Sequence, residues 1–383
     1  MSAGASGRPR ADTAATDVLF APLVLGALEL PNRVIMPALT RMRASAEGVP
    51  QPVNAEYYGQ RASAGLIIAE ATAISVQGRG YPQMPGIHAP EQIAGWRLVT
   101  EAVHAKGGRI ALQIVHHGRW SHSLYNDGNL PVAPSAIAAP GMIYTPTFTQ
   151  VPFETPRELE IAEIPDLIES FREAARNAIT AGFDAVEIHG ANGFLLDQFL
   201  QDGSNHRTDA YGGSVENRAR LLLEIVDSVT EEIGAARTAV RLSPHGNLGG
   251  LGDSDTVPHF SYIIAQISHR NIAWLHLIEP RASSAGIADD ASVDSADNAA
   301  LFRHLFDGPV ITAGGYFPES GATAVATGFA DAVAFGRMFI ANPDLPERIR
   351  SSRPLNSFDR STSYGGDGHG YTDYPALGSN GAE

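Results

Sequence analysis

The chain has 383 residues, of which 44% are hydrophobic and 18% charged, and its formal net charge is −15. This is the composition of a globular protein with a large core, and the negative charge disfavours nucleic acid or an anionic membrane as the main partner. The absence of cysteine excludes disulfides, thiolate metal sites, iron–sulfur clusters and cysteine nucleophiles. We find no membrane span or signal peptide in the sequence, so a cytoplasmic location is expected.

Residues 1–16 are rich in Ala, Gly and Ser and are expected to be disordered, whereas β-rich runs alternate with helical patterns in the rest of the chain. The clearest helices span Asp166–Ala181, before Gly182, and the segment from Ser214 to Gly234. Eight runs are expected to be strands: Arg33–Pro37, Leu66–Glu70, Ile110–Gln113, Ala185–His189, Ala239–Ser243, Trp274–Ile278, Pro309–Gly314 and Ala332–Gly336.

Eight strand and helix pairs without an internal repeat predict a single (β/α)₈ TIM barrel over residues 17–383. A doubly wound sheet is the alternative, but the sequence lacks the G-x-G-x-x-G turn of a dinucleotide-binding unit. Residues 114–163, after the third strand, are too many for an ordinary loop and are expected to form a lid over the barrel mouth. The tail, residues 351–383, is expected to pack onto the barrel near the site.

The C-terminal ends of barrel strands carry the active site in this fold. The glycines of AGGYF and FGRMF, which end the last two strands, predict a phosphate site unless they are only tight turns. Arg241 and the amide of Gln113 suit a ring with paired N–H and C=O groups. Together these features predict bound flavin mononucleotide (FMN).

His189 and Asn192 follow the fourth strand. If the chain turns helically there, both side chains face the same way and can donate to one carbonyl oxygen, which stabilises the enolate formed when hydride reaches the β carbon. The alternative is a packed structural histidine. No metal is expected, because His116, His117 and His122 cluster without a recognised ligand pattern. The only lysine, Lys106, precedes the third strand and therefore lies at the end of the barrel opposite the active site. This position disfavours a Schiff-base aldolase.

The sequence resembles the Old Yellow Enzyme family of FMN-dependent ene-reductases from about Leu19 to Pro375. The matching stretches are NRVIMPALTRMRA, EIHGANGFLLDQFLQDGSNHRTDAYGGSVENRARLLLEIVD, RLSP, FGRMFIANPDL and GHGYTDYP. The resemblance implies non-covalently bound FMN, NAD(P)H as reductant and an activated alkene, an α,β-unsaturated carbonyl compound, as substrate. It also implies a ping-pong cycle, in which NAD(P)H reduces the flavin and leaves before the flavin N5 passes hydride to the alkene.

The resemblance further assigns roles to individual residues. Thr40, His189 and Asn192 would be catalytic: Thr40 near the flavin C4 carbonyl, and the other two as anchors of the substrate carbonyl. Gln113 and Arg241 would hold the pyrimidine edge of the flavin. The residues implied to contact the cofactor are Ala38, Leu39, Thr40, Ala71, Gln113, Arg241, Ala313, Gly314, Gly315, Gly336 and Arg337, and the further residues implied to line the substrate pocket are Val115, Phe194 and Tyr364.

Two positions depart from the family pattern. Phe194 stands where a tyrosine usually protonates the substrate, and Val115 stands where a tryptophan is common, which predicts a wider pocket. Tyr364, Tyr125, Tyr144 or water could then supply the proton. Alternatively, the flavin serves mainly nitro-group or nitrate-ester reduction or a desaturation, or the barrel binds flavin without catalysis. A monomer or a homodimer is expected.

Overall fold

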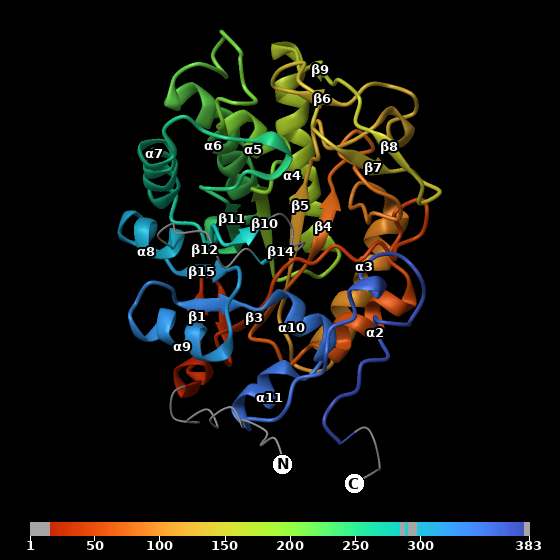
Figure 1. The fold of residues 1–383 in the computed structure, drawn as a ribbon, viewed down its shortest axis with the longest axis vertical. Helices are drawn as coiled ribbons and strands as arrows, with labels where there is room; N and C mark the ends of the chain where they lie inside the picture. Colours follow the sequence, from red (N-terminus) through yellow and green to blue (C-terminus); the bar gives the residue numbers. More distant parts are fainter. Residues whose placement is uncertain (1–15, 284–287, 290–296, 379–383) are drawn as a thin grey trace, which may run out of the picture.

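The computed structural model describes residues 16–283, 288–289 and 297–378, so the predicted disorder of residues 1–16 lies, except for Thr16, outside the described residues. Eight parallel strands, each a neighbour of the next along the chain, close into one barrel surrounded by helices (Figure 1). The strands are β3 (Val34–Met36), β4 (Leu66–Ala73), β5 (Ile110–Val115), β10 (Ala185–Gly190), β11 (Thr238–Leu242), β12 (Trp274–Ile278), β15 (Val310–Ala313) and β16 (Ala332–Ala334). Each overlaps one predicted strand, and the predicted TIM barrel is therefore confirmed.

Helices connect the strands on the outside of the barrel. The described helices are α2 (Pro52–Gln60), α3 (Pro90–His104), α4 (Ile164–Thr180), α5 (Leu195–Leu200), α6 (Val215–Ile233), α7 (Thr256–Ser268), α8 (Asn298–Phe302), α9 (Pro318–Ala326), α10 (Gly336–Ala341) and α11 (Leu345–Arg350). Both clearly predicted helices are present, as α4 and α6. The Ser214 hydroxyl caps α6 by accepting the Asn217 N–H at 3.4 Å, and Gly234 ends the helix with φ 87°. Within the described ranges, no helix is both long and apolar enough to cross a membrane.

Side chains on the barrel strands alternate between the helices and the barrel interior. Val186 and Ile188 of β10 pack outward with the helices, whereas Ala185 belongs to a second cluster inside the barrel. A hairpin of β1 (Leu23–Leu25) and β2 (Leu28–Leu30) adds three leucines to that inner cluster. Because the hairpin contacts the loop before β11 through the Ala27 N–H to Ala236 carbonyl bond of 2.9 Å, it closes the N-terminal end of the barrel.

The segment between β5 and α4 forms short paired strands. β5 extends to Val115, so the insertion starts two residues later than predicted, and it ends before a 3-10 turn at Ile161–Glu163. Its strands are β6 (Val132–Ala133), β7 (Met142–Tyr144), β8 (Gln150–Pro152) and β9 (Arg157–Glu158), with β6 paired to β9 and β7 to β8. In Figure 1 these strands lie at the end of the molecule toward which β4 and β5 point. The function of the segment as a lid stays a prediction.

The tail beyond Ser351 packs against the barrel, as the sequence predicts. The buried Arg41, which follows the β3 end, donates from Nε to the Ser363 carbonyl at 2.9 Å and from Nη2 to the Gly370 carbonyl at 2.7 Å. The Tyr371 ring stacks on Tyr57 of α2 at 3.9 Å between centroids. The tail is therefore held by the same loop that carries the predicted cofactor residues Ala38, Leu39 and Thr40.

Candidate active site

Polar side chains occupy the inward positions at the C-terminal end of the barrel. Gln113, Glu187 and Arg241 each stand two residues after an alanine of the inner cluster, so they face the interior. The strand register sets Glu187 opposite Gln113, and His189, two residues further along β10, opposite Arg241. These four side chains form the polar layer of the site. Three neighbouring strands thus bring together the predicted residues Gln113, His189 and Arg241.

Glu187 is fully buried and accepts three hydrogen bonds. The donors are Gln113 Nε2 at 2.7 Å, His276 Nδ1 at 2.8 Å and Trp274 Nε1 at 3.1 Å. Burial acts to raise the pKa of Glu187, but His276, Arg241 and Trp274 outweigh it and hold the pKa below its ordinary value. Burial lowers the pKa of His276, and the charge of Glu187 opposes that shift. Glu187 is an ionised carboxylate under the site, and it is not among the residues predicted from the sequence.

Arg241 is the unsatisfied member of this layer. Its side chain is 8% exposed, and its Nε is buried with no hydrogen-bond partner among the described residues. A buried guanidinium without an acceptor is costly, so a ligand that offers acceptors or negative charge would stabilise it. Gln113, whose Nε2 is held by Glu187, leaves its Oε1 free of described partners. A guanidinium donor and an amide acceptor fit the carbonyl and N–H groups on the pyrimidine edge of FMN.

His189 is a neutral hydrogen-bond donor. The Ala191 N–H donates to its Nδ1 at 3.3 Å, which places the ring proton on Nε2. Burial, reinforced by the neighbouring Arg241 charge, holds the pKa of His189 well below its usual range. Since Nε2 has no partner in the described part of the chain, its N–H is available to a ligand.

The chain does not turn helically directly after β10, so the condition on which the sequence argument for Asn192 rests is not met. Asn192 and Gly193 both have positive φ, 57° and 80°, and α5 starts only at Leu195. The turn is held by the Asn192 N–H, which donates to Ser243 Oγ at 2.9 Å, and by the Gly193 N–H, which donates to Asp197 Oδ2 at 2.9 Å. The half-buried Asn192 amide has no described partner and is available as a donor, but left-handed backbone rather than helical spacing positions it.

Phe194 is surrounded by aromatic rings. Its ring lies 5.0 Å from that of His189 in an edge-on arrangement and 4.3 Å from that of His117, measured between centroids. His117 donates from Nδ1 to the Gly78 carbonyl at 3.0 Å, and burial lowers its pKa to about 4. Its buried Nε2 is therefore an acceptor without a described partner, so neutral His117 offers Phe194's neighbourhood no proton from that nitrogen.

Thr40 and Ala71 meet at Tyr81, a residue that is not predicted from the sequence. The Tyr81 hydroxyl donates to the Ala71 carbonyl at 3.0 Å and lies 3.5 Å from Thr40 Oγ1. Val115 belongs to the same small apolar cluster as Ala71 and Tyr81, and Phe194 packs against that cluster. The structure thus joins the predicted cofactor residues Thr40 and Ala71 to the predicted substrate residues Val115 and Phe194.

The remaining predicted cofactor residues lie at the ends of β3, β15 and β16. Ala38 packs against the inner cluster, and Leu39 lies beside Gly336, where an added Cβ would stand 3.4 Å from Leu39 Cδ2. Arg337 follows in the first turn of α10.

Gly314 and Gly315 follow Ala313, the last residue of β15, with φ 118° and 64°. A Cβ on Gly314 would stand 2.7 Å from the Ala282 Cβ. Glycine alone fits this turn without strain, which leaves the backbone N–H groups open to a phosphate.

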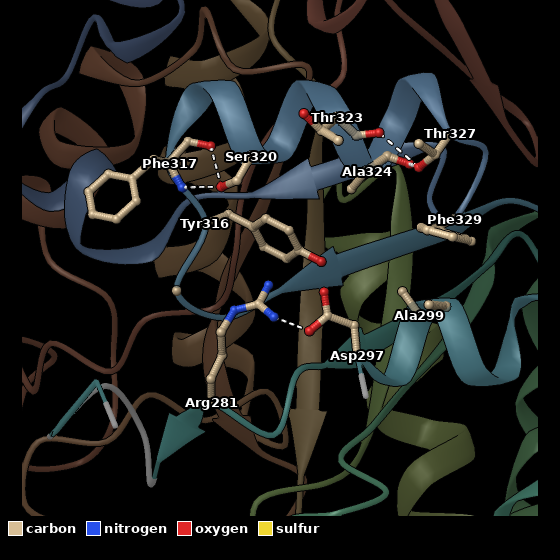
Figure 2. A pocket seen from close by; sticks show the side chains of 12 residues that line it. Arg281, Asp297, Ala299, Tyr316, Phe317, Ser320, Thr323, Ala324, Thr327 and Phe329 are labelled. Atoms are coloured by element: carbon tan, nitrogen blue, oxygen red, sulfur yellow. Dashed lines mark hydrogen bonds and ion pairs between the residues drawn. The ribbon is translucent and has the colours of Figure 1, made fainter. Parts of the chain in front are cut away.

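A pocket of about 520 Å³ lies beside this glycine turn (Figure 2). Figure 2 shows the Arg281 guanidinium directed at Asp297, with which it forms an ion pair. The Arg281 Cζ also lies 4.4 Å from the centroid of the Tyr316 ring. The residues that line it are Arg281, Asp297, Ala299, Ala300, Gly315, Tyr316, Phe317, Ser320, Thr323, Ala324, Thr327 and Phe329. Gly315 is the one predicted cofactor residue that borders this pocket. The pocket therefore flanks the expected phosphate position and is separate from the polar layer.

Tyr364 is the outermost of the predicted substrate residues, with 42% of its surface exposed. The next residue, Gly365, donates its N–H to the Arg41 carbonyl at 2.9 Å, and a Cβ there would stand 2.9 Å from the Phe148 ring of the insertion. The tail and the insertion therefore meet at Tyr364.

The histidines expected to cluster do not form a metal site. Within the described ranges, no three or more His, Asp or Glu side chains are arranged to hold a metal ion. His116 bonds to Gln77 at 3.3 Å, and His122 pairs with Glu154 at 3.4 Å.

Comparison with known proteins agrees with this geometry. Residues 18–356 match the model of the NADH:flavin oxidoreductase / NADH oxidase family. The chain is 46% identical to 12-oxophytodienoate reductase 1 of Oryza sativa subsp. japonica over 95% of this chain and 94% of the relative. It is 49% identical to morphinone reductase, solved in complex with tetrahydroNAD, with a TM-score of 0.88 over 95% of this chain and 99% of the other. It is 43% identical to the Old Yellow Enzyme homologue from Zymomonas mobilis, with a TM-score of 0.89 over 94% and 99%.

A polar layer that fits the edge of FMN, set in a barrel shared with these proteins over nearly its full length, has one consistent explanation. The chain belongs to the NADH:flavin oxidoreductase / NADH oxidase family and is an NAD(P)H-dependent FMN oxidoreductase of the Old Yellow Enzyme type.

Proposed function

We propose that the protein reduces the C=C bond of α,β-unsaturated carbonyl compounds in a ping-pong cycle with NAD(P)H. The pair of available donors at the end of β10, the His189 Nε2–H and the Asn192 amide, carries this proposal. Neutral donors polarise a carbonyl and stabilise the enolate oxygen that develops when hydride arrives. The relatives are named as reductases of 12-oxophytodienoate and of morphinone, and both names denote ketones.

The cofactor-binding roles are also proposals. FMN, when bound, supplies the hydride chemistry that no side chain of this protein can perform. Arg241 and Gln113 would hold its pyrimidine edge, and the Thr40 hydroxyl would contact the C4 carbonyl. The residues that would line the ring or bind the phosphate are Ala38, Leu39, Ala71, Ala313, Gly314, Gly315, Gly336 and Arg337.

We propose that Val115, Phe194 and Tyr364 line the substrate pocket. Val115 and Phe194 share one apolar cluster, and Tyr364 stands at the mouth between the tail and the insertion. Residues 116–160 would act as the lid whose contacts determine the substrate.

The proton for the substrate α carbon needs a source other than Phe194. Tyr125 already donates its hydroxyl to the Tyr144 carbonyl, which disfavours it. The half-exposed Tyr364 and water entering beside it are the stronger candidates, whereas the Tyr81 hydroxyl donates to the Ala71 carbonyl at 3.0 Å and is disfavoured on the same ground as Tyr125. General acid help is worth about 10²- to 10⁴-fold, so a weak source slows alkene reduction without abolishing it.

Phe194 also motivates a second candidate function on the same flavin: reduction of nitro groups or nitrate esters, or a desaturation. Such reactions do not need an acid at the α carbon of an enone. The two candidates share the cofactor and the NAD(P)H step, and they differ in which oxidised substrate restores the flavin fastest.

Single-turnover reoxidation separates the two. The purified protein is reduced anaerobically with NADH or NADPH, freed of nucleotide, and mixed with cyclohexenone or with a nitroaromatic compound while the flavin absorbance is followed. Faster reoxidation by cyclohexenone supports the enone proposal, and full reoxidation of the nucleotide-free reduced protein supports the ping-pong order. Reoxidation by the nitroaromatic alone would refute the enone proposal and leave the second candidate.

The cytoplasmic location and the monomer or homodimer state are proposals from the sequence. Sedimentation of the FMN-loaded protein measures the oligomeric state directly, and a larger assembly would contradict the expectation.

A further inference from the structure

We propose that Glu187 is a positioning residue for the cofactor: it fixes the orientation of the Gln113 amide, so that the Gln113 carbonyl oxygen faces the flavin N3–H. Glu187 contacts none of the reacting atoms and acts through Gln113. The proposal rests on the FMN-binding activity and does not depend on which substrate the enzyme reduces.

The hydrogen bonds to Glu187 determine the amide orientation. An ionised carboxylate has no hydrogen to donate, so the group of Gln113 that stands 2.7 Å from Glu187 Oε1 has to be the NH₂ group. Trp274 Nε1, which can only donate, and His276 Nδ1 both occupy Oε2, and this pins the carboxylate in place. Gln113 is therefore unable to rotate its amide by 180° without setting two acceptors against each other.

Burial makes this orientation costly to reverse. Glu187 and His276 have fully buried side chains, and Gln113 is 1% exposed. No water can compensate a mismatched bond there, and a buried pair of like dipoles costs more than the same pair at a surface. Ring N3 of a flavin is a donor, so only the carbonyl face of Gln113 complements it.

Glu187 also sets the charge beside the ring. Arg241 is the cation of the same layer, and Glu187 is the only carboxylate among the described residues whose charge acts on it. Removing the Glu187 charge leaves Arg241 uncompensated, which favours the reduced, more negative flavin.

The variant Glu187→Gln tests the orientation. Its carbonyl oxygen can keep the Trp274 and His276 bonds, which turns its NH₂ group toward Gln113 and forces the Gln113 amide to invert. The NH₂ group of Gln113 then meets the flavin N3–H. We expect the dissociation constant of FMN to rise about tenfold, measured by fluorescence titration of the apoprotein. We also expect a more positive flavin midpoint potential.

Flavin methylated at N3 provides the readout that a merely structural role would not move. The native protein should bind 3-methyl-FMN much more weakly than FMN, because the Gln113 acceptor loses its donor. In Glu187→Gln this discrimination should shrink by about tenfold or more. The swapped variant Gln113→Glu with Glu187→Gln should recover it, because it restores an acceptor toward N3 and the original net charge.

The matched control is Asp253→Asn, which breaks another buried carboxylate–histidine pair, with His259, outside the polar layer. It should leave FMN affinity, discrimination and potential unchanged. Equal discrimination in the native protein and Glu187→Gln would overturn the proposal, as would a native protein that binds 3-methyl-FMN and FMN equally. Equal binding of 3-methyl-FMN and FMN by the native protein overturns the proposal even if Glu187→Gln fails to fold.

Discussion

Glu187 and Arg241 face the same barrel interior from neighbouring strands, yet the carboxylate has three hydrogen-bond donors and the guanidinium has no described acceptor. In the polar layer, the carboxylate of Glu187 therefore has its hydrogen-bond partners, whereas the guanidinium of Arg241 lacks them among the described residues. Folding has retained a buried cation whose acceptors must come from a ligand. This asymmetry separates residues that hold the site together from residues that hold the cofactor.

Replacing Arg241 should stabilise the apoprotein while it impairs the cofactor site. In Arg241→Met a buried charge without a described hydrogen-bond acceptor disappears, so the free energy of unfolding of the apoprotein should rise by about 1 to 3 kcal/mol. FMN affinity should fall by about tenfold or more, because a charge-assisted contact is lost. Urea unfolding of the apoprotein and fluorescence titration with FMN measure the two effects.

Arg61 provides the control for this prediction. It is buried like Arg241, but its guanidinium donates to the Phe339 and Ile340 carbonyls at 2.9 and 2.7 Å. Arg61→Met should therefore destabilise the apoprotein by about 2 to 4 kcal/mol. Similar destabilisation by both variants would show that Arg241 has a partner in the folded apoprotein.

A second prediction concerns phosphate binding at Gly315. Gly328, in the turn after α9, provides a matched control. Gly315 and Gly328 both have left-handed backbone, with φ 64° and 76°, but an added Cβ meets the Arg281 side chain at 3.2 Å only at Gly315. Each change to alanine should cost about 1 kcal/mol of apoprotein stability through backbone strain. Gly315→Ala alone should weaken FMN binding, by about tenfold. Equal FMN affinities in the two variants would place the phosphate elsewhere.

Much of this architecture follows from sequence patterns. Runs of β-branched residues between helical periods predict all eight strands, and the residues that end them include most of the polar layer. The sequence of strand β10 also indicates that Glu187 belongs to the site, because it is a charged residue two positions before His189, on the inward face of an otherwise apolar strand. That indication needs the closed barrel to be understood, because only closure shows that the inward face is buried.

The other site residues could not be predicted from the sequence, because tertiary contacts determine their positions. Tyr81 and His117 reach the site from loops without periodicity, and their positions depend on which strand ends they meet. The turn at Asn192 and Gly193 is left-handed because the backbone is tied to Ser243 and Asp197, residues distant in sequence or in the next helix. The Asn-Gly pair was a local sign of positive φ, and it outweighs the helical spacing.

Glu70 on β4 gives a prediction about pH. It accepts the Arg41 N–H at 3.1 Å and is fully buried, and burial raises its pKa from 4.5 to about 7. Between these values the unfolded chain releases the proton first, so the stability contributed by protonated Glu70 is lost as the pH rises, and the loss is complete above about pH 7. Glu70→Gln, which mimics the protonated acid, should exceed the native apoprotein in stability at pH 8 by up to about 3 kcal/mol.

Urea unfolding at pH 4.5, 6 and 8 measures this difference. At pH 4.5 the variant and the native protein should be nearly equal in stability. The exposed Glu56 of α2 serves as the control, since Glu56→Gln should show no such widening with pH. A constant difference between Glu70→Gln and the native protein across this range would mean that Glu70 is ionised throughout.

Phe194→Tyr tests proton delivery at the substrate. Aromatic contacts at 5.0 and 4.3 Å, measured between ring centroids, hold the Phe194 ring beside His189 and His117, so the substitution adds a hydroxyl to a ring whose position is already fixed. If proton delivery limits the native enzyme, the added acid should speed single-turnover reoxidation by cyclohexenone by about tenfold or more, and lower its solvent isotope effect. Reoxidation by a nitroaromatic compound should be unchanged, because that reaction needs no proton at the α carbon.

Phe194→Leu is the control, because it changes the ring without supplying a proton and should not accelerate either reaction. A tenfold gain in Phe194→Tyr would mean that the native chain lacks an efficient donor, and simple enones are then unsuitable as its main substrates. An unchanged and already fast rate would mean that another group, such as Tyr364 or bound water, delivers the proton, and enone reduction would stand as the function. A change confined to the nitroaromatic reaction would contradict both proposals, since neither assigns Phe194 a part in that step.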